Sequence, residues 1–375
     1  MLTAVAVFGS LLVLGTVVFF HELGHFLAAK ISNVAVGRFS VGFGKALWSR
    51  EFGGTLYQVA VLPCGGFVEI IGQSDNGEQV EEQLARLQGK LSPASVERLR
   101  DRSRWFHNRP GWAQLLVAAG GPLFSFLFTI LVFTMLTWTL GSSAPVGRPE
   151  IISVLPGTPA AKAGLQPGDA FVSINGKAME HYGQVIETIG MSGGSGVALE
   201  MLRGGDTVRI SISPESNPIS GGEAGMPFRI GVALKPQEFF AKEVGFFPAL
   251  RHSVGMVGES IHRTASLVVQ LITGKMPLSS ISGPVGITKS GSDWIKAGLL
   301  PTLIFAAMIS SALGAAQLIP IPPLDGSRIL FAGWKMLTGR PVNRKFEGAL
   351  TGVGTVALLG LMLVISAREI FWLFV

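Results

Sequence analysis

The amino-acid sequence predicts a polytopic α-helical membrane protein with about four transmembrane helices, a membrane-associated β-hairpin and an inserted extracytoplasmic α+β domain. Three observations predict this class. Of the 375 residues, 48% are hydrophobic and 14% are charged, whereas soluble proteins carry about 25% charged residues. Several apolar stretches are long enough to cross a bilayer. Between them, the residue pattern changes from a helical to a strand period in two places.

The net charge of +6 does not indicate nucleic-acid binding, because the basic residues flank apolar segments instead of forming one cluster. We expect no nucleic-acid partner. The single cysteine, Cys64, excludes internal disulfides and C-x-x-C metal sites.

The first predicted transmembrane helix covers 1–30 and contains His21-Glu22-Leu23-Gly24-His25 after twenty uncharged residues. On a helix, His21 and His25 lie one turn apart on the same face and can reach one metal ion. Glu22 lies beside them as a general base, which is the H-E-x-x-H arrangement of zinc peptidases. The alternative is a chance pentapeptide at a helix end. We expect the segment to be retained, because it lacks the basic start and small-residue cleavage site of a signal peptide.

Residues 31–74 read as a membrane-associated β-hairpin, with Val-, Phe- and Gly-rich runs on either side of a turn at 49–54. Gly42-Phe43-Gly44 carries little side-chain bulk. The hairpin has two open interpretations: its edge offers pairing to an extended peptide, or it only packs on the helices.

A charged helical loop is predicted for 75–110, with Ser92-Pro93 starting a short helix. The second transmembrane helix, 111–141, is uncharged and contains Ala118-Ala119-Gly120-Gly121-Pro122, which allows another helix to approach closely. The loop between the two spans is rich in Lys and Arg, which places it in the cytoplasm and the amino terminus outside.

Residues 146–235 are predicted to form a PDZ domain on the outer side of the membrane. A strand precedes Pro156-Gly157-Thr158-Pro159-Ala160-Ala161-Lys162-Ala163-Gly164-Leu165, and the turn 166–169 leads to a second strand. A helix at 182–189 and two paired strands, 197–202 and 207–212, follow. This succession resembles a bacterial PDZ domain, whose groove binds peptide ends by strand addition.

An amphipathic extracytoplasmic linker helix is predicted for 240–290, lying on the membrane or on the PDZ domain without crossing the bilayer. His252 and His262 on it are read as solvated residues.

The third transmembrane segment, 297–324, ends in a proline-rich run before Asp325. Because ionisable residues at membrane depth are costly, Asp325 is the candidate third metal ligand; the alternative is a helix-terminal Asp at the interface. A basic cytoplasmic loop, 325–348, and a fourth transmembrane helix, 349–375, complete the chain.

These motifs together resemble the site-2 protease family of intramembrane zinc metalloproteases, in its bacterial RseP-like form with a single PDZ domain. The resemblance covers nearly the whole chain, including Gly42-Phe43-Gly44, Leu324-Asp325-Gly326 and the run 282–287. It implies that His21, His25 and Asp325 bind Zn²⁺ and that Glu22 is the catalytic base. It also implies that the hairpin edge, with Gly42, Phe43 and Gly44, aligns an unwound substrate.

The same resemblance implies hydrolysis of peptide bonds within transmembrane segments of single-pass membrane proteins, as in regulated intramembrane proteolysis of anti-sigma factors or signal-peptide remnants. The expected location is the bacterial cytoplasmic (inner) membrane, with the active site near its cytoplasmic side.

The chain departs from the family pattern at three positions, where Ser125, Ala312 and Gln317 stand in place of Asn. These departures concern substrate-orienting contacts and not the metal ligands, and Gln317 keeps an amide with which to bind substrate. They leave open the alternative of a catalytically inactive membrane PDZ adaptor. A further alternative is an ion or proton transporter that uses Asp325 and the histidines.

Overall fold

The computed structural model describes residues 2–73, 77–145, 148–216, 228–235, 239–274 and 282–374. The chain forms two compact units. The first comprises Met1–Met135, Phe247–Thr264 and Gly283–Val375, and the second comprises Leu136–Phe246 and Ala265–Ser282.

Among the described residues, four helices are long and apolar enough to cross a membrane, as the sequence predicts. They are α1 (Leu2–Ile31), α4 (Gly111–Leu140), α9 (Leu299–Gln317) and α11 (Arg344–Phe374). Pro122 lies inside α4 without ending it. The third predicted span, 297–324, is helical only as far as Gln317, since the proline-rich stretch that follows cannot continue the helix.

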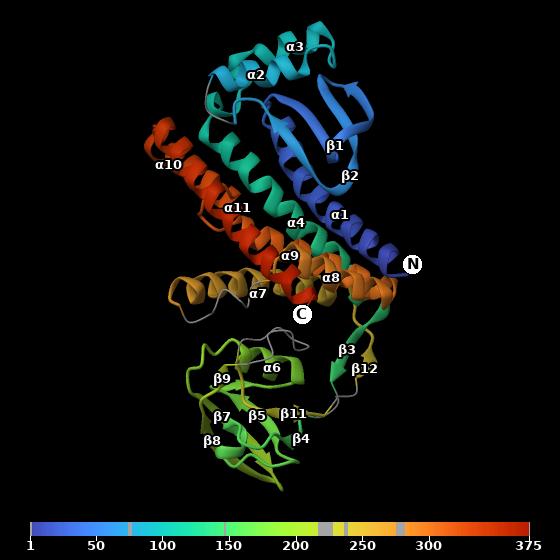
Figure 1. The fold of residues 1–375 in the computed structure, drawn as a ribbon, viewed down its shortest axis with the longest axis vertical. Coiled ribbons are helices and arrows are strands. Elements are labelled where there is room, and N and C mark those ends of the chain that lie inside the picture. The colour runs from blue at the N-terminus through green and yellow to red at the C-terminus, as the bar shows by residue number, and fades with distance from the viewer. Residues whose placement is uncertain are drawn as a thin grey trace. The chain divides into compact units, whose positions relative to one another are not determined.

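The predicted hairpin is present as the antiparallel pair β1 (Val36–Phe52) and β2 (Thr55–Ile70). Its turn uses Gly53 and Gly54 at positive φ, which glycine adopts without steric cost. In Figure 1 the hairpin lies beside α1, and Phe26 of α1 packs with Phe39 and Ile70 in one buried cluster. This packing holds the strands against the helix that carries the histidines.

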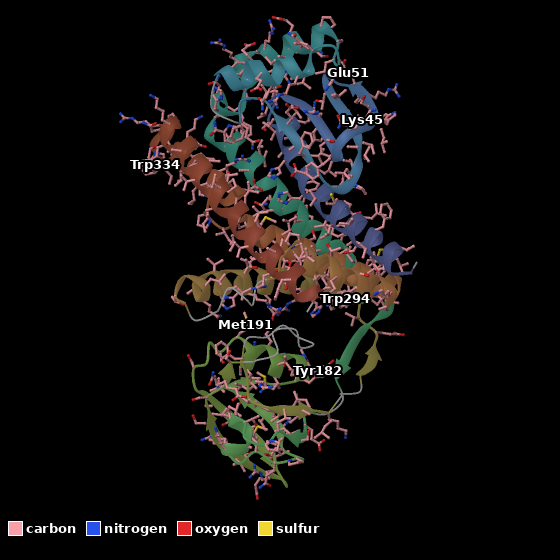
Figure 2. All side chains as sticks on the ribbon, viewed as in Figure 1. Lys45, Glu51, Tyr182, Met191, Trp294 and Trp334 are labelled. Atoms are coloured by element: carbon pink, nitrogen blue, oxygen red, sulfur yellow. The ribbon has the colours of Figure 1, made fainter. Side chains whose placement is uncertain are left out.

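Two short helices, α2 (Gly77–Leu87) and α3 (Pro93–Arg100), lie beyond the hairpin (Figure 1). As predicted, Ser92 immediately precedes α3 and Pro93 occupies its first turn. The Ser92 N–H donates to the carboxylate of Glu51 at 2.6 Å. Glu51 is labelled in Figure 2. The hairpin end therefore binds the start of α3.

Two further helices of the first unit are α8 (Pro284–Lys296) and α10 (Asp325–Thr338). Lys335 of α10 donates to the carbonyls of His107 and Arg109 at 3.1 and 2.7 Å, which docks α10 on the start of α4. Glu369 of α11 accepts from the N–H groups of Gly283 and Gly286, at the start of α8, at 2.6 and 3.1 Å.

The second unit contains the strands and helices expected of the PDZ domain. A four-stranded sheet has the order β6-β5-β7-β8. Its strands are β5 (Ala170–Ile174), β6 (Lys177–Ala178), β7 (Val197–Arg203) and β8 (Asp206–Ile212). Two helices, α5 (Pro159–Lys162) and α6 (Tyr182–Gly190), accompany it, and Phe171, Ile174, Leu199 and Met201 lie in its core. The predicted helix at 182–189 and the predicted strand pair are thus in place.

Short strand pairs complete this unit: β4 with β11, β9 with β10 and β3 with β12. Their bounds are Ile151–Val154 (β4), Val232–Leu234 (β11), Glu215–Ser216 (β9), Phe228–Arg229 (β10), Ser142–Pro145 (β3) and Phe239–Lys242 (β12).

The predicted linker helix, 240–290, is divided in the structure. It contains the end of β12, the helix α7 (Phe246–Ile272) and the beginning of α8. The division follows the local residues, since Gly274 at positive φ follows α7 and Pro284 starts α8.

Candidate metal centre

His21 and His25 lie one turn apart on α1, and both are buried. Their Nε2 atoms are 3.2 Å apart. The apolar sequence of α1 carries no proline, so the helix runs unbroken through the motif. The predicted pairing of the two imidazoles on one helix face is therefore present.

Asp325 is the first residue of α10 and is buried. Its Oδ2 lies 3.2 Å from His21 Nε2 and 3.1 Å from His25 Nε2. The turn before it is tight, because a side chain at Gly326 would overlap the carbonyls of Leu318 and Ile319. Thus the carboxylate, some 300 residues after the histidines, joins them in one cluster whose ligand atoms all lie within 4.8 Å of one another.

The donor set fits Zn²⁺. Two imidazole nitrogens and one carboxylate oxygen, with a fourth position left for water, are the ligands of a catalytic zinc site. His25 Nδ1 lies 2.7 Å from the Val117 carbonyl, and His21 Nδ1 lies 3.0 Å from Ser125 Oγ. Since both Nδ1 atoms have partners elsewhere, both Nε2 atoms face Asp325.

Gly121 of α4 makes room for this cluster. A Cβ at this position would overlap the Nε2 atoms of both His21 and His25. One residue earlier, a Cβ at Gly120 would lie 2.6 Å from the Gly24 carbonyl oxygen on α1. The small residues of α4, predicted to permit close helix approach, therefore bring its backbone against both α1 and the imidazoles.

Glu22 lies outside the three-residue cluster. Its Oε2 accepts a hydrogen bond from the Val68 N–H of β2 at 3.0 Å. This contact ties the predicted base to the hairpin. Sequence reasoning did not find Val68, because a backbone donor on a strand leaves no residue-type signal.

Gly42 and Gly44 of the hairpin adopt positive φ values of 89° and 90°. Phe43 between them is 42% exposed, and its ring stacks on Phe67 at a centroid distance of 6.2 Å. Phe67 directly precedes Val68 on β2. The predicted substrate-binding residue Phe43 therefore contacts β2 next to the N–H group that binds Glu22.

The three positions that depart from the family have separate surroundings. Ser125 is fully buried and contacts His21. Gln317 Oε1 accepts from the Asp325 N–H at 3.2 Å, so its amide supports the backbone of the carboxylate ligand. Ala312 is exposed on α9, away from the buried face that carries Ser310 and Ser311. Two of the three positions therefore serve the cluster directly.

Arg328 also lies close to Asp325, although no motif singles it out. Its Nη1 lies 3.8 Å from Asp325 Oδ1, one turn along α10. The signal for it was the three-residue spacing from Asp325, which brings two side chains together on a helix.

Comparison with known proteins places the chain among peptidases. The family model described as Peptidase family M50 matches residues 9–361. A relative from Mesorhizobium japonicum is 30% identical, over 96% of this chain and 97% of the relative. Zinc metalloprotease RasP of Geobacillus kaustophilus is 29% identical, over 98% of each chain. The regulator of sigma-W protease RasP of Bacillus subtilis is 27% identical, over 97% of this chain and 98% of the relative.

Proposed function

This chain belongs to peptidase family M50 and is a zinc metalloprotease, and we propose that it hydrolyses peptide bonds within the transmembrane segments of other membrane proteins. One observation carries the proposal. His21 and His25, on the first of the four candidate spans, form a buried cluster with Asp325, which begins the helix after the third span. Polar groups of this kind are costly at membrane depth unless they bind something.

In this proposal His21 Nε2, His25 Nε2 and an Asp325 oxygen hold Zn²⁺. Zn²⁺ held there would supply Lewis-acid chemistry toward the scissile carbonyl and the attacking water. Glu22 does the proton chemistry. Its carboxylate takes a proton from the attacking water as the new C–O bond forms, and it delivers that proton to the amide nitrogen as the C–N bond breaks. The Val68 N–H holds the carboxylate in place before the reaction.

A substrate helix must unwind before it is cut, because its carbonyls are hydrogen-bonded and shielded in the helix. We assign the alignment of the extended segment to the hairpin, with Gly42, Phe43 and Gly44 at its edge. Gln317 supports Asp325 and offers its remaining amide donors to the substrate. Small or helix-breaking residues near the cleavage point should therefore favour cutting.

The proposed location is the bacterial cytoplasmic membrane, with the active site near its cytoplasmic side and the PDZ domain outside. The support is the distribution of Lys and Arg, which lie mainly between the first two spans and after Asp325. Single-pass membrane proteins are the proposed substrates, and peptide ends are the proposed ligands of the PDZ groove. Because one relative is named for regulating sigma-W, anti-sigma factors are one proposed substrate class.

An inactive adaptor is a poorer account of the site. That alternative came from the replacement of three Asn residues. Ser125 and Gln317, however, make contacts with His21 and Asp325 that support the cluster, and Ala312 faces away from it. The replacements therefore give no reason to expect a lost activity.

The position of the cut tests the proposal. A tagged single-pass substrate is co-expressed with the wild-type chain or with Glu22→Gln, and the products are mapped by mass spectrometry. We expect cleavage inside the apolar segment of the substrate with the wild type and none with Glu22→Gln. Cleavage only in the soluble flanks of the substrate would contradict the intramembrane assignment.

A further inference from the structure

His21 contacts a serine hydroxyl that is not one of the proposed metal ligands. Ser125 on α4 is fully buried, and its Oγ lies 3.0 Å from His21 Nδ1. We propose that Ser125 is a positioning residue that holds the His21 ring in the orientation and the tautomer required for zinc. This inference rests on the proposed role of His21 as a ligand.

The two histidines differ in how their tautomers are set. The Val117 carbonyl can only accept, so His25 Nδ1 must donate to it and leave a lone pair on Nε2. A serine hydroxyl can either donate or accept. His21 therefore presents its Nε2 lone pair to the cluster only when Ser125 Oγ accepts from the Nδ1–H. Among the hydrogen bonds of the described residues, the contact with Ser125 is the one at His21 Nδ1.

The surroundings of Ser125 fix its position. Its backbone carbonyl accepts from Thr129 Oγ1 at 3.0 Å and from Ser310 Oγ at 2.9 Å. On the α9 side, a Cβ at Gly314 would lie only 3.1 Å from Ser125 Cβ, so α9 packs closely against the serine. Helix α4 and the close packing of α9 thus set the place of Ser125, and the bond from Ser310 reaches its backbone carbonyl, not the hydroxyl that contacts His21.

Gly121, one turn before Ser125, completes the same helix face. Its missing side chain leaves the space that both Nε2 atoms occupy. This face of α4 therefore leaves room at His21 Nε2, through Gly121, and supplies a hydrogen-bond partner at His21 Nδ1, through Ser125. Partners of this kind typically affect metal affinity by about 10- to 100-fold.

A purely structural role for Ser125 is the competing explanation. It would be one of several buried hydroxyls that join α4 to α9, and its removal would weaken packing without any specific effect on metal. Ser310 is the matched control, because it is also a fully buried serine. Its hydroxyl bonds the Ser125 carbonyl and not a histidine.

The test uses the purified full-length protein in detergent. Zinc affinity is measured by chelator competition, Co²⁺ coordination by its visible absorption spectrum, and the stability of the metal-free protein by thermal unfolding. We expect Ser125→Ala to weaken zinc binding by about 10- to 100-fold and to change the Co²⁺ spectrum. Ser310→Ala should lower thermal stability to a similar degree but retain the wild-type zinc affinity and spectrum.

Equal zinc affinities for Ser125→Ala and Ser310→Ala would overturn the inference and leave the proposed function standing. Ser125→Cys, which nearly conserves volume but hydrogen-bonds weakly, is the second variant if Ser125→Ala does not fold. It should weaken zinc binding in the same direction, and unchanged binding would count against the inference. A wild-type protein without stoichiometric zinc would overturn the proposed function and this inference together.

Discussion

At the scale of single residues, the metal centre depends as much on an absent side chain as on the ligands. His21 and His25 can converge on Asp325 only because Gly121 carries no Cβ where their Nε2 atoms lie. A glycine at this position is therefore part of the site, although it donates nothing to a metal.

Gly121→Ala should consequently weaken zinc binding. The added methyl group overlaps both Nε2 atoms, and relieving such overpacking typically costs about 1–3 kcal/mol. We expect zinc affinity to fall at least about 10-fold with a corresponding loss of proteolysis. Gly360→Ala on α11 is the matched control, because nothing lies within 4 Å of the position of its Cβ. Wild-type zinc content in purified Gly121→Ala would show that the helices separate to admit the methyl group.

At the scale of elements, the hairpin is linked to the chemistry through one backbone donor. The Val68 N–H of β2 holds the Glu22 carboxylate at 3.0 Å, while Phe67 beside it stacks on Phe43. A movement of the hairpin would therefore move the base.

Val68→Pro removes this donor, since proline has no N–H. We expect kcat to fall about 10-fold or more, as misplacement of a catalytic group commonly causes, while the zinc content is unchanged. Val68→Ala keeps the N–H and trims only the side chain, so it should remain close to wild type. Kinetics on a reconstituted transmembrane peptide compare the two variants, and equal rates would remove the Glu22–Val68 contact from the mechanism.

The second unit contains an ion pair with a buried carboxylate, which predicts a pH dependence. Asp169 is 1% exposed, and Arg203 Nε and Nη2 each donate to it at 2.7 Å. These hydrogen bonds from Arg203 hold the pKa of the Asp169 carboxyl below its usual range. The folded pKa therefore lies below the unfolded value of about 3.9.

A lowered carboxyl pKa stabilises the folded state above the unfolded pKa, and this stability is lost as the pH falls through the folded pKa. We expect the second unit to keep its stability from pH 7 to about pH 5 and to lose it progressively below about pH 4. Asp169→Asn should be less stable by about 1–3 kcal/mol at pH 7 and should lack this part of the pH dependence. Hydrogen exchange of β5 and β7 peptides in the full-length protein measures both, and identical profiles would contradict the assignment.

At the scale of the whole molecule, sequence reasoning found what is encoded locally. The His21–His25 spacing needs only one helical turn, and Asp325 is conspicuous as a charge that ends an apolar stretch. The four spans and the hairpin follow from hydrophobic period and turn residues. Ser125, Gly121 and Val68 could not be assigned in this way, because their roles arise from contacts between elements far apart in the chain. Gln317 was expected to face the substrate, and only the structure showed its contact with Asp325.

We propose that the second unit, the predicted PDZ domain, filters substrates by the size of their outer part and takes no part in the chemistry. The strands β3 and β12 pair with Pro145 opposite Phe239. The residues between these two positions can therefore be replaced by a short turn that joins the paired strands. Replacing 146–238 by a short glycine-containing turn should permit cleavage of a substrate that still carries a bulky outer domain, which the full-length protein should leave uncut. Loss of cleavage of an already trimmed substrate, in a variant that retains zinc, would refute the filter.

The central claim is that His21, His25 and Asp325 hold zinc while Glu22 supplies only proton chemistry. Metal analysis of the purified Glu22→Gln and Asp325→Ala variants, beside the wild type, tests this claim most directly. We predict one zinc per wild-type chain and one per Glu22→Gln chain, although Glu22→Gln is inactive, and little or none in Asp325→Ala. Stoichiometric zinc in Asp325→Ala, or its loss in a folded Glu22→Gln, would contradict this division of roles.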